Sequence, residues 1–224
     1  MGSGRSFAMT IAGVAAYGLA IRPWFMHWGA TDSEVERDLP GDDLTSNSAW
    51  QATRGITIHA PVETVWTSLM QAGRDQDECC IRSWRPRPAE RADHRESGPP
   101  EPPHEARKVG DSVWLIHPER WCSAARYVVA ILDPGRAMVL VSPAKAERLT
   151  TGDPGGEGSR AFVVEPIDGN STRLIVRSRA GENLGIAGWL CAFLIVDPGQ
   201  FLMERRMMLG IKAQAEKSTR YGRG

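Results

Sequence analysis

The histidines are the first side chains in this sequence that could take part in chemistry. His59 and His117 stand at the ends of predicted strands, where an imidazole can act as a general acid or base. His94 and His104 lie ten residues apart among acidic residues, and such a pair can bind a metal ion. No partner carboxylate can be assigned to the first pair, and the second pair stands in a polar, proline-rich stretch. We therefore expect structural histidines and a solvated loop rather than a catalytic or metal site.

Other chemical signatures are missing from the sequence. Motifs of the types GxSxG, HExxH and GxxxxGK[ST] do not occur, and neither does an EF-hand loop. The glycine-rich run 151–158 leads into a predicted strand rather than a helix, so it does not predict a phosphate site. The sequence assigns no catalytic residue, no metal and no cofactor. This lowers the case for an enzyme without removing it, since catalysis by shaping the substrate leaves little trace in a sequence. The cysteines have no CxxC or metal-finger spacing, which favours reduced thiols that are buried or idle: Cys79, Cys80, Cys122 and Cys191.

The charges of the chain balance. Its 224 residues include 27 Lys and Arg against 27 Asp and Glu, so no net field attracts nucleic acid. Hydrophobic residues make up 42% of the chain, which is enough to bury a core. Eight tryptophans against three tyrosines indicate large apolar contact areas.

Residues 1–30 form an apolar N-terminal segment. Residues 7–21 carry no charge, but as a helix they span only about 22 Å, less than the ~30 Å hydrocarbon core of a bilayer. If Arg22 reaches the surface, the apolar length extends over residues 7–28 and places tryptophans at head-group level. Three interpretations stand side by side: a membrane anchor, which we favour, a helix packed on the domain, and a cleaved signal peptide. We expect a cytoplasmic protein that this segment can tether to a membrane.

The remainder of the chain divides into a linker and a folded domain. Residues 31–49 are polar and acidic and predict a linker, with one short helix that begins at a Thr31–Glu34 capping box. The domain then spans residues 50–220. Within it, residues 82–107 contain six prolines and almost no apolar side chain besides Trp84, so we expect a mobile loop.

The domain begins with a strand and a short helix. Ile56 and Ile58 alternate with polar residues, as in a strand with one buried face. Pro61 and the apolar spacing after it predict a helix that ends near Gly73. An antiparallel meander follows, with strands predicted at 109–116, 126–132, 137–141, 160–166 and 172–180.

The chain then ends in helix. The run 184–196 is uncharged, 201–217 is rich in helix formers, and a helix-start signature lies between them at Asp197, Pro198 and Gln200. In the strand before it, arginines share one face, which we interpret as the solvated outer face of the sheet; a basic ligand clamp is the less favoured alternative. These arginines are Arg173, Arg177 and Arg179, with Ile175 among them.

This order of elements resembles the START/Bet-v-1-like (SRPBCC) superfamily. ITIHAPVETVWTSLMQAG is similar to its opening strand and helix, and KVGDSVWL resembles a "VGD" strand of many members. HWGATDSEVERDLPGDDL and PGQFLMERRMMLGIKAQAE resemble the two ends of a bacterial branch labelled polyketide cyclase/dehydrase or lipid transport. The likeness covers residues 22–217 with a gap at 82–107, where the family usually has an aromatic, glycine-containing segment.

The resemblance implies an α+β helix-grip fold, in which a curved antiparallel sheet wraps around a long C-terminal helix, here with an extra N-terminal apolar helix. It also implies a cavity between sheet and helix for a hydrophobic small molecule. Its walls would come from inward strand residues and from the inner face of the C-terminal helix. The candidate ligand-binding residues are Trp66, Met70, Trp114, Tyr127, Met138, Phe162, Met203 and Met207.

Three functions are compatible with this fold. Binding or transport of a hydrophobic molecule such as a lipid or polyketide ranks first, with membrane contact through residues 7–28 as an addition. A polyketide cyclase, aromatase or dehydratase is the alternative, which a polar acid–base pair facing the cavity would favour. The third is a structural or interaction domain whose interior is filled by its own side chains.

Overall fold

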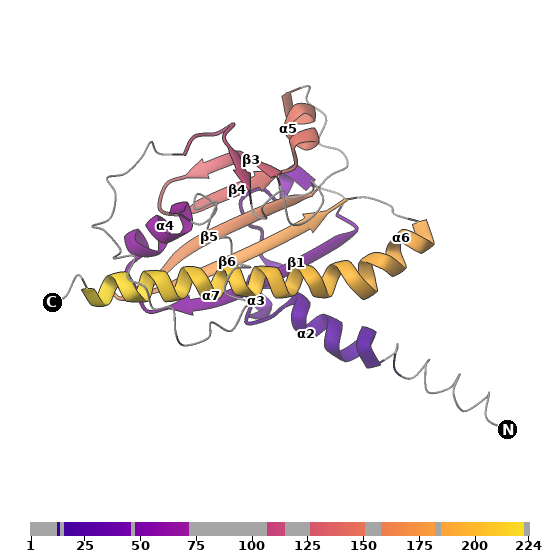
Figure 1. The fold of residues 1–224 in the computed structure, drawn as a ribbon, viewed down its shortest axis with the longest axis horizontal. Coiled ribbons are helices and arrows are strands. Elements are labelled where there is room, and N and C mark those ends of the chain that lie inside the picture. Colours follow the sequence, from indigo (N-terminus) through magenta and orange to yellow (C-terminus); the bar gives the residue numbers. More distant parts are fainter. Residues whose placement is uncertain are drawn as a thin grey trace, which may run out of the picture.

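The computed structural model shows an α+β fold built on a single antiparallel sheet. It describes residue 13 and the ranges 16–45, 48–71, 107–114, 126–150, 158–181 and 185–221. The sheet has six strands in the order β1-β6-β5-β4-β3-β2, and a long C-terminal helix lies across one of its faces (Figure 1). This is the predicted helix-grip fold. The strands are β1 (Trp50–Ile58), β2 (Ser112–Trp114), β3 (Arg126–Asp133), β4 (Ala137–Val141), β5 (Ser159–Asp168) and β6 (Ser171–Ala180).

The opening strand and helix form where the sequence pattern places them. β1 leads through Pro61 into α4 (Val62–Gln71), whose first turn closes when Val65 donates its backbone N–H to the Pro61 carbonyl at 3.1 Å. Proline suits this position because the first helical N–H groups have no partner within the helix. α4 buries Val65 and Leu69 toward the sheet.

Tight turns set the register of the meander. Between β3 and β4, Arg136 donates its N–H to the Asp133 carbonyl at 3.0 Å, and Gly135 has φ +80°, as a type II turn requires. β5 and β6 pair from Ser159↔Arg179 to Asp168↔Ser171, and β1 pairs with β6 from Trp50↔Ala180 to Ile58↔Thr172. The first strand of the chain therefore lies beside the last. A helix that the sequence did not predict, α5 (Pro143–Thr150), follows β4.

The C-terminal helix runs on where the sequence predicted a new start. α6 (Gly185–Cys191), the π-helical turn η4 (Ala192–Val196) and α7 (Asp197–Tyr221) follow one another without a break in helical backbone, and Asp197 itself has φ −59° and ψ −50°. Proline inside a helix removes a backbone donor and crowds the preceding turn. The wider turn of η4 directly before Pro198 accommodates this, since the Asp197 N–H bonds to the Ala192 carbonyl.

The N-terminal helix also has a π-helical turn before a proline, and it packs against the C-terminal helix. A π-helical turn, η1 (Tyr17–Ile21), precedes α2 (Arg22–Met26), which has Pro23 in its first turn. Arg22 and Asp197, the residues before the two prolines, form an ion pair at 2.9 Å. The Tyr17 hydroxyl donates to the Phe193 carbonyl at 2.7 Å, which takes the place of the N–H that Pro198 lacks. We call η1–α2 and α6–η4 together the helix pair.

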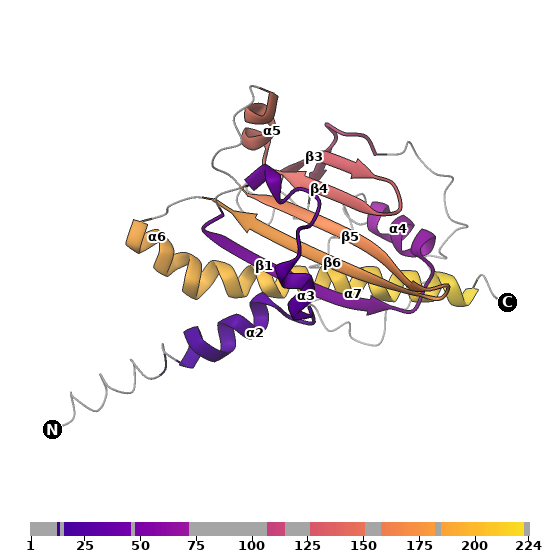
Figure 2. The same ribbon diagram turned by 180° about the vertical axis from the view of Figure 1, so that it is seen from behind.

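The segment after the helix pair lies on the outer face of the sheet. It holds α3 (Asp32–Glu36), with the expected capping box of Thr31 and Glu34, and the 3-10 turn η2 (Asp43–Thr45). Figure 2 shows this segment crossing the strands on the side opposite α7. We call residues 31–45, predicted as part of a linker, the strap.

The main core fills the space between the inner face of the sheet and helices α4 and α7. Its centre includes Leu69 of α4, Leu140 and Phe162 of the sheet, and Met208 and Ile211 of α7. A smaller cluster on the outer face packs Leu39 of the strap against the sheet. The sheet is therefore covered on both faces.

Candidate functional site

A buried carboxylate lies at the centre of the polar contacts between the sheet and α7. Glu204, on α7, is fully buried and receives four partners. Arg54 pairs with its Oε2, and Arg160 pairs with its Oε1 at 2.9 Å. Ser178 and Gln200 donate to Oε1 at 2.8 and 3.1 Å. We call Arg54, Arg160, Ser178, Gln200 and Glu204 the inner cluster.

Arg54 enters this cluster from β1. Its Nε donates to the Phe25 carbonyl at 2.9 Å, its Nη1 faces Glu204, and its guanidinium carbon lies 5.4 Å from the centre of the Phe201 ring. The remaining nitrogen, Nη2, is buried and has no hydrogen-bond partner among the described residues. One of the three donor nitrogens of this side chain is therefore unsatisfied.

Arg160 repeats the arrangement from β5. Its Nε donates to the Ser178 hydroxyl at 3.0 Å, its Nη2 faces Glu204, and its guanidinium carbon lies 5.3 Å from the centre of the Tyr127 ring. Nη1 is buried and, within the part of the chain that the structure describes, unpartnered. Buried donors without a partner are rare in native proteins and call for an explanation.

The cluster carries an excess positive charge. Burial by itself raises the pKa of the Glu204 carboxyl, but Arg160 and Arg54, with the hydrogen bonds from Gln200 and Ser178, hold that pKa below its ordinary value. Burial likewise lowers the pKa of Arg160, but Tyr127 and Glu204 raise it. Glu204 is thus ionised at neutral pH, and two guanidinium groups share one carboxylate.

These residues were missed in the sequence, although a signal for them exists. Arg54 stands in register with Ile56 and Ile58 on the inward side of β1, and Arg160 stands in register with Phe162 on β5. Glu204 precedes Met207, Met208 and Ile211 at helical spacing on the buried side of α7. Each of the three is therefore a charged residue at a position where the apolar pattern of its strand or helix predicts a buried side chain.

Most of the residues predicted from the family resemblance lie in the main core or pack against it. Met138, Phe162 and Met207 belong to the main core, and Trp66, Met70 and Tyr127 are half-buried and pack against it. Met203 is half-buried on α7 and does not belong to the main core. The side chain of Trp114 lies outside the described residues. Whether any of them contacts a ligand stays a prediction.

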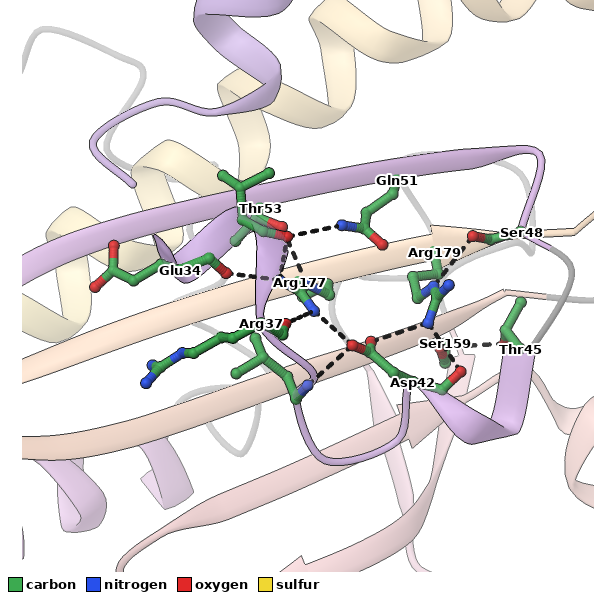
Figure 3. Close-up of polar contacts among 12 residues, drawn as sticks. Glu34, Arg37, Asp42, Thr45, Ser48, Gln51, Thr53, Ser159, Arg177 and Arg179 are labelled. Atoms are coloured by element: carbon green, nitrogen blue, oxygen red, sulfur yellow. Dashed lines mark hydrogen bonds and ion pairs between the residues drawn. The ribbon is translucent and has the colours of Figure 1, made fainter. Parts of the chain in front are cut away.

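The arginine face of β6 does not face solvent, and the prediction of a solvated face is wrong. Arg177 is buried beneath the strap. It donates to Thr53 at 3.0 Å, to the carbonyls of Glu34, Val35 and Arg37 at 2.6–2.9 Å, and to the Asp42 carboxylate (Figure 3). Apart from Thr53 of β1, these partners are backbone carbonyls and the Asp42 carboxylate of the strap, which could not be predicted from the strand alone.

The neighbouring arginines of β6, Arg173 and Arg179, also bind residues of the strap. Arg173 binds both oxygens of Glu34 at 2.7 and 2.8 Å and reaches the Gly29 carbonyl and the Thr57 hydroxyl. Arg179 pairs with Asp42 at 3.3 Å. Burial raises the pKa of Glu34, but the bonds from Arg173 and from the Thr31 backbone bring it below its ordinary value. We call Arg173, Arg177 and Arg179, with Glu34 and Asp42, the outer cluster.

Of the other residues with predicted chemistry, few lie among those that the structure describes. His59 is exposed; its backbone N–H donates to Glu216 at 3.0 Å, and its Nδ1 lies 3.4 Å from the Ser171 hydroxyl. No group of three or more His, Cys, Asp and Glu that could hold a metal occurs among the described residues. His94, His104 and His117 lie outside them, as does the predicted mobile loop 82–107 apart from Arg107. Cys191 is an exposed free thiol.

The helix pair exposes an apolar surface. Residues of both its helices are open to solvent, with Leu19, Ile186 and Ile195 exposed by 82%, 84% and 69%. Trp24 and Trp189 stand on the same pair and are also exposed, whereas Phe25 is buried. Within the described ranges, no helix combines the length and the apolar character needed to cross a membrane.

Comparisons with known proteins find similar structures but no similar sequence. No family model matches the chain, and no curated protein has a similar sequence. Solved structures of similar fold include polyketide cyclase-like proteins. The di-domain ARO/CYC StfQ from the steffimycin biosynthetic pathway is 15% identical, with a TM-score of 0.47 over 80% of this chain and 55% of StfQ. This chain therefore spans about half of that protein.

Two further structures match over nearly their whole length. A protein from Chromobacterium violaceum is 15% identical, with a TM-score of 0.42 over 74% of this chain and 96% of its own. A Polyketide_cyc-like protein from Corynebacterium glutamicum is 18% identical, with a TM-score of 0.34 over 76% of this chain and 90% of its own. These likenesses concern the fold alone, which the strand order and the C-terminal helix of this chain already define as the helix-grip fold.

Proposed function

We propose that this protein binds a hydrophobic small molecule, such as a lipid or a polyketide-like compound, between the inner face of the sheet and α7. The observation that carries the proposal is a set of three large side chains, from α4 and β3, that border the main core. Trp66, Met70 and Tyr127 are only half-buried, although they pack on the core of the fold. Ligand sites are mostly lined by such aromatic and apolar groups, with a few convergent polar ones. The inner cluster supplies polar groups at the same interface.

The charges of the inner cluster favour binding over acid–base catalysis. A general acid or base must change its protonation state near the working pH. Glu204 is held ionised by Arg160 and Arg54 and already accepts two further hydrogen bonds. A cyclase or dehydratase, the alternative function, would therefore need another group to transfer protons.

Native mass spectrometry of the purified protein, followed by extraction and identification of bound molecules, tests the binding function. We expect a hydrophobic compound to copurify with the wild type and to be lost in a Trp66→Ala/Tyr127→Ala variant. Trp24→Ala is the matched control, because Trp24 is an exposed tryptophan of the helix pair and does not pack against the main core. A folded protein that carries nothing and takes up no fluorescent apolar probe would instead support the structural function.

We also propose that the helix pair rests on a lipid bilayer, which would tether the protein at the membrane surface. Large exposed apolar patches on soluble proteins are uncommon and mark contact sites. Here the exposed side chains come from two helical segments joined by the Tyr17–Phe193 hydrogen bond, with the Arg22–Asp197 ion pair directly beside it. The apolar sequence continues toward the N-terminus through residues 7–15, and tryptophans such as Trp24 and Trp189 favour the head-group region.

Flotation with phosphatidylcholine vesicles tests this contact. The wild type should float with the vesicles, and Trp24→Ser/Trp189→Ser/Ile195→Ser should remain in the dense fraction. The control, Val109→Ser/Ile167→Ser/Tyr221→Ser, removes three exposed apolar residues elsewhere on the molecule and should float like the wild type. Equal behaviour of the two triple variants contradicts a specific role of the helix pair.

A further inference from the structure

The inner cluster holds one more positive charge than negative charge, in a place closed to solvent. The side chains of Arg54 and Glu204 are 0% exposed, and that of Arg160 is 4% exposed. Cation–π contacts with Phe201 and Tyr127 offset part of the cost of burying the cations. They do not accept the hydrogen bonds of Arg54 Nη2 and Arg160 Nη1, which have no partner among the residues that the structure describes.

The two free nitrogens belong to guanidinium groups that already meet at one carboxylate. Arg54 and Arg160 approach Glu204 from β1 and β5, on either side of β6 in the sheet. The remaining nitrogens are therefore donors from two side chains that converge at the interface of sheet and α7. This is the same interface at which we propose that the hydrophobic ligand binds.

We propose that the inner cluster binds a carboxylate group of that ligand, so that the protein takes hydrophobic carboxylic acids. The proposal rests on the proposed binding function and names its ligand class. A single negative charge balances the two arginines and Glu204, whereas a phosphate dianion would leave an excess negative charge. Guanidinium groups are well suited to this role because they stay charged and donate in the plane of a carboxylate.

A matched pair of probes tests the assignment. Dansyl-undecanoic acid and its methyl ester share chain and fluorophore but differ in charge, and fluorescence titration gives Kd for both. Charge-assisted hydrogen bonds predict that the wild type binds the acid about tenfold to a hundredfold more tightly than the ester. In Arg160→Met this preference should fall to about twofold or less, because the affinity for the acid falls toward that for the ester. Arg136→Gln, in the exposed β3–β4 turn, should retain the wild-type preference.

The outcomes separate this inference from the function on which it rests. Equal binding of acid and ester by the wild type, or an unchanged preference in Arg160→Met, overturns the carboxylate site and leaves hydrophobic binding in place. Binding of neither probe overturns both. The far-ultraviolet circular dichroism and thermal midpoint of Arg160→Met verify that the variant is folded, and Arg160→Lys, which keeps the charge, should recover part of the preference.

Discussion

Arg160 and Arg177 stand one register step apart on neighbouring strands and point to opposite faces of the same sheet. Both are buried, and each belongs to a cluster in which arginines outnumber carboxylates by one. They differ in the partners of their nitrogens. Every guanidinium nitrogen of Arg177 donates either to the Thr53 hydroxyl of β1 or to carbonyl and carboxylate oxygens of the strap. Arg160, in contrast, has one nitrogen without a partner within the described part of the chain. The comparison teaches that the two clusters differ in hydrogen bonding rather than in net charge. An arginine whose donors are all satisfied holds the strap on the sheet, whereas an arginine with an unsatisfied donor is a candidate for ligand binding.

The largest expected effect comes from removing the carboxylate of the inner cluster. Glu204→Gln leaves two buried guanidinium groups without a counter-charge, so we expect the free energy of unfolding to fall by about 3–5 kcal/mol. Urea denaturation measures the change. Glu165→Gln is the control, since its pair with Arg37 is exposed and is worth less than about 1 kcal/mol. A similar small loss in both variants would show that the inner charges are not the strong determinant that their burial indicates.

The outer cluster should respond to loss of its central arginine. Arg177→Met removes the donors to three strap carbonyls and to Asp42, and we expect a loss of about 3 kcal/mol in the free energy of unfolding. Hydrogen exchange should also rise over residues 31–45, because the strap loses its main attachment. Wild-type exchange rates in this segment would contradict the role assigned to Arg177.

A smaller loss is expected where the strap approaches the sheet. Gly41 has φ +88°, and a Cβ there would lie 2.6 Å from Cγ1 of Val139. Gly41→Ala should therefore cost about 2 kcal/mol through backbone strain and this contact. Gly135→Ala has a similar φ of +80° but open space around it, so it isolates the backbone contribution. Thermal unfolding of both gives the difference, and equal losses would mean that the strap can shift away from Val139.

Lowering the pH should decrease the contribution of both clusters to the free energy of unfolding, by a modest amount per pH unit. The pKa values of Glu204 and Glu34 lie below their ordinary values in the folded protein. Each carboxylate therefore contributes stability that is complete above the unfolded-state pKa of about 4.3 and is lost as the pH falls through the folded-state pKa. The slope is at most about 1.4 kcal/mol per pH unit for each group. Urea denaturation from pH 7 to pH 3 should be flatter for Glu34→Gln than for the wild type; an identical pH profile would show that Glu34 does not contribute.

The smallest effect on stability is expected for Arg160→Met, which makes on the inner face the change that Arg177→Met makes on the outer face. Arg160→Met leaves Arg54 and Glu204 as a balanced pair and replaces an incompletely bonded cation with an apolar side chain. We expect the free energy of unfolding of the ligand-free protein to change by less than about 1 kcal/mol, or to rise. Urea denaturation beside Arg177→Met makes the comparison direct. A loss as large as that of Arg177→Met would remove the distinction between the two clusters.

The sequence predicts the fold well because local patterns determine it. Alternation in β1 and β6, the Asp133–Arg136 turn and Pro61 before α4 each act within a few residues. Contacts between distant segments follow no such pattern. The sequence predicts a linker where the strap lies, because the polar residues of the strap find their partners on β6, more than a hundred residues away.

The candidate site could be predicted only in part, for a related reason. Apolar residues near it, such as Phe162 and Met138, follow from strand alternation. Arg54 and Glu204 each interrupt an apolar face, and an isolated charge in such a place is readily taken for an exposed one. Only the fold, which brings two strands and α7 together, shows that these charges compensate each other.

The pairing of the first strand with the last has a consequence for synthesis on the ribosome. Arg54 is separated from Glu204 by 150 residues of chain. At about 5–20 residues per second, translation leaves Arg54 without its counter-ion for about 8–30 s. Burying its charge earlier would be unfavourable, so β1 must stay hydrated while the β3–β5 hairpins form. Completion of the sheet and closure of α7 over it are therefore coupled, late events in the folding of the nascent chain.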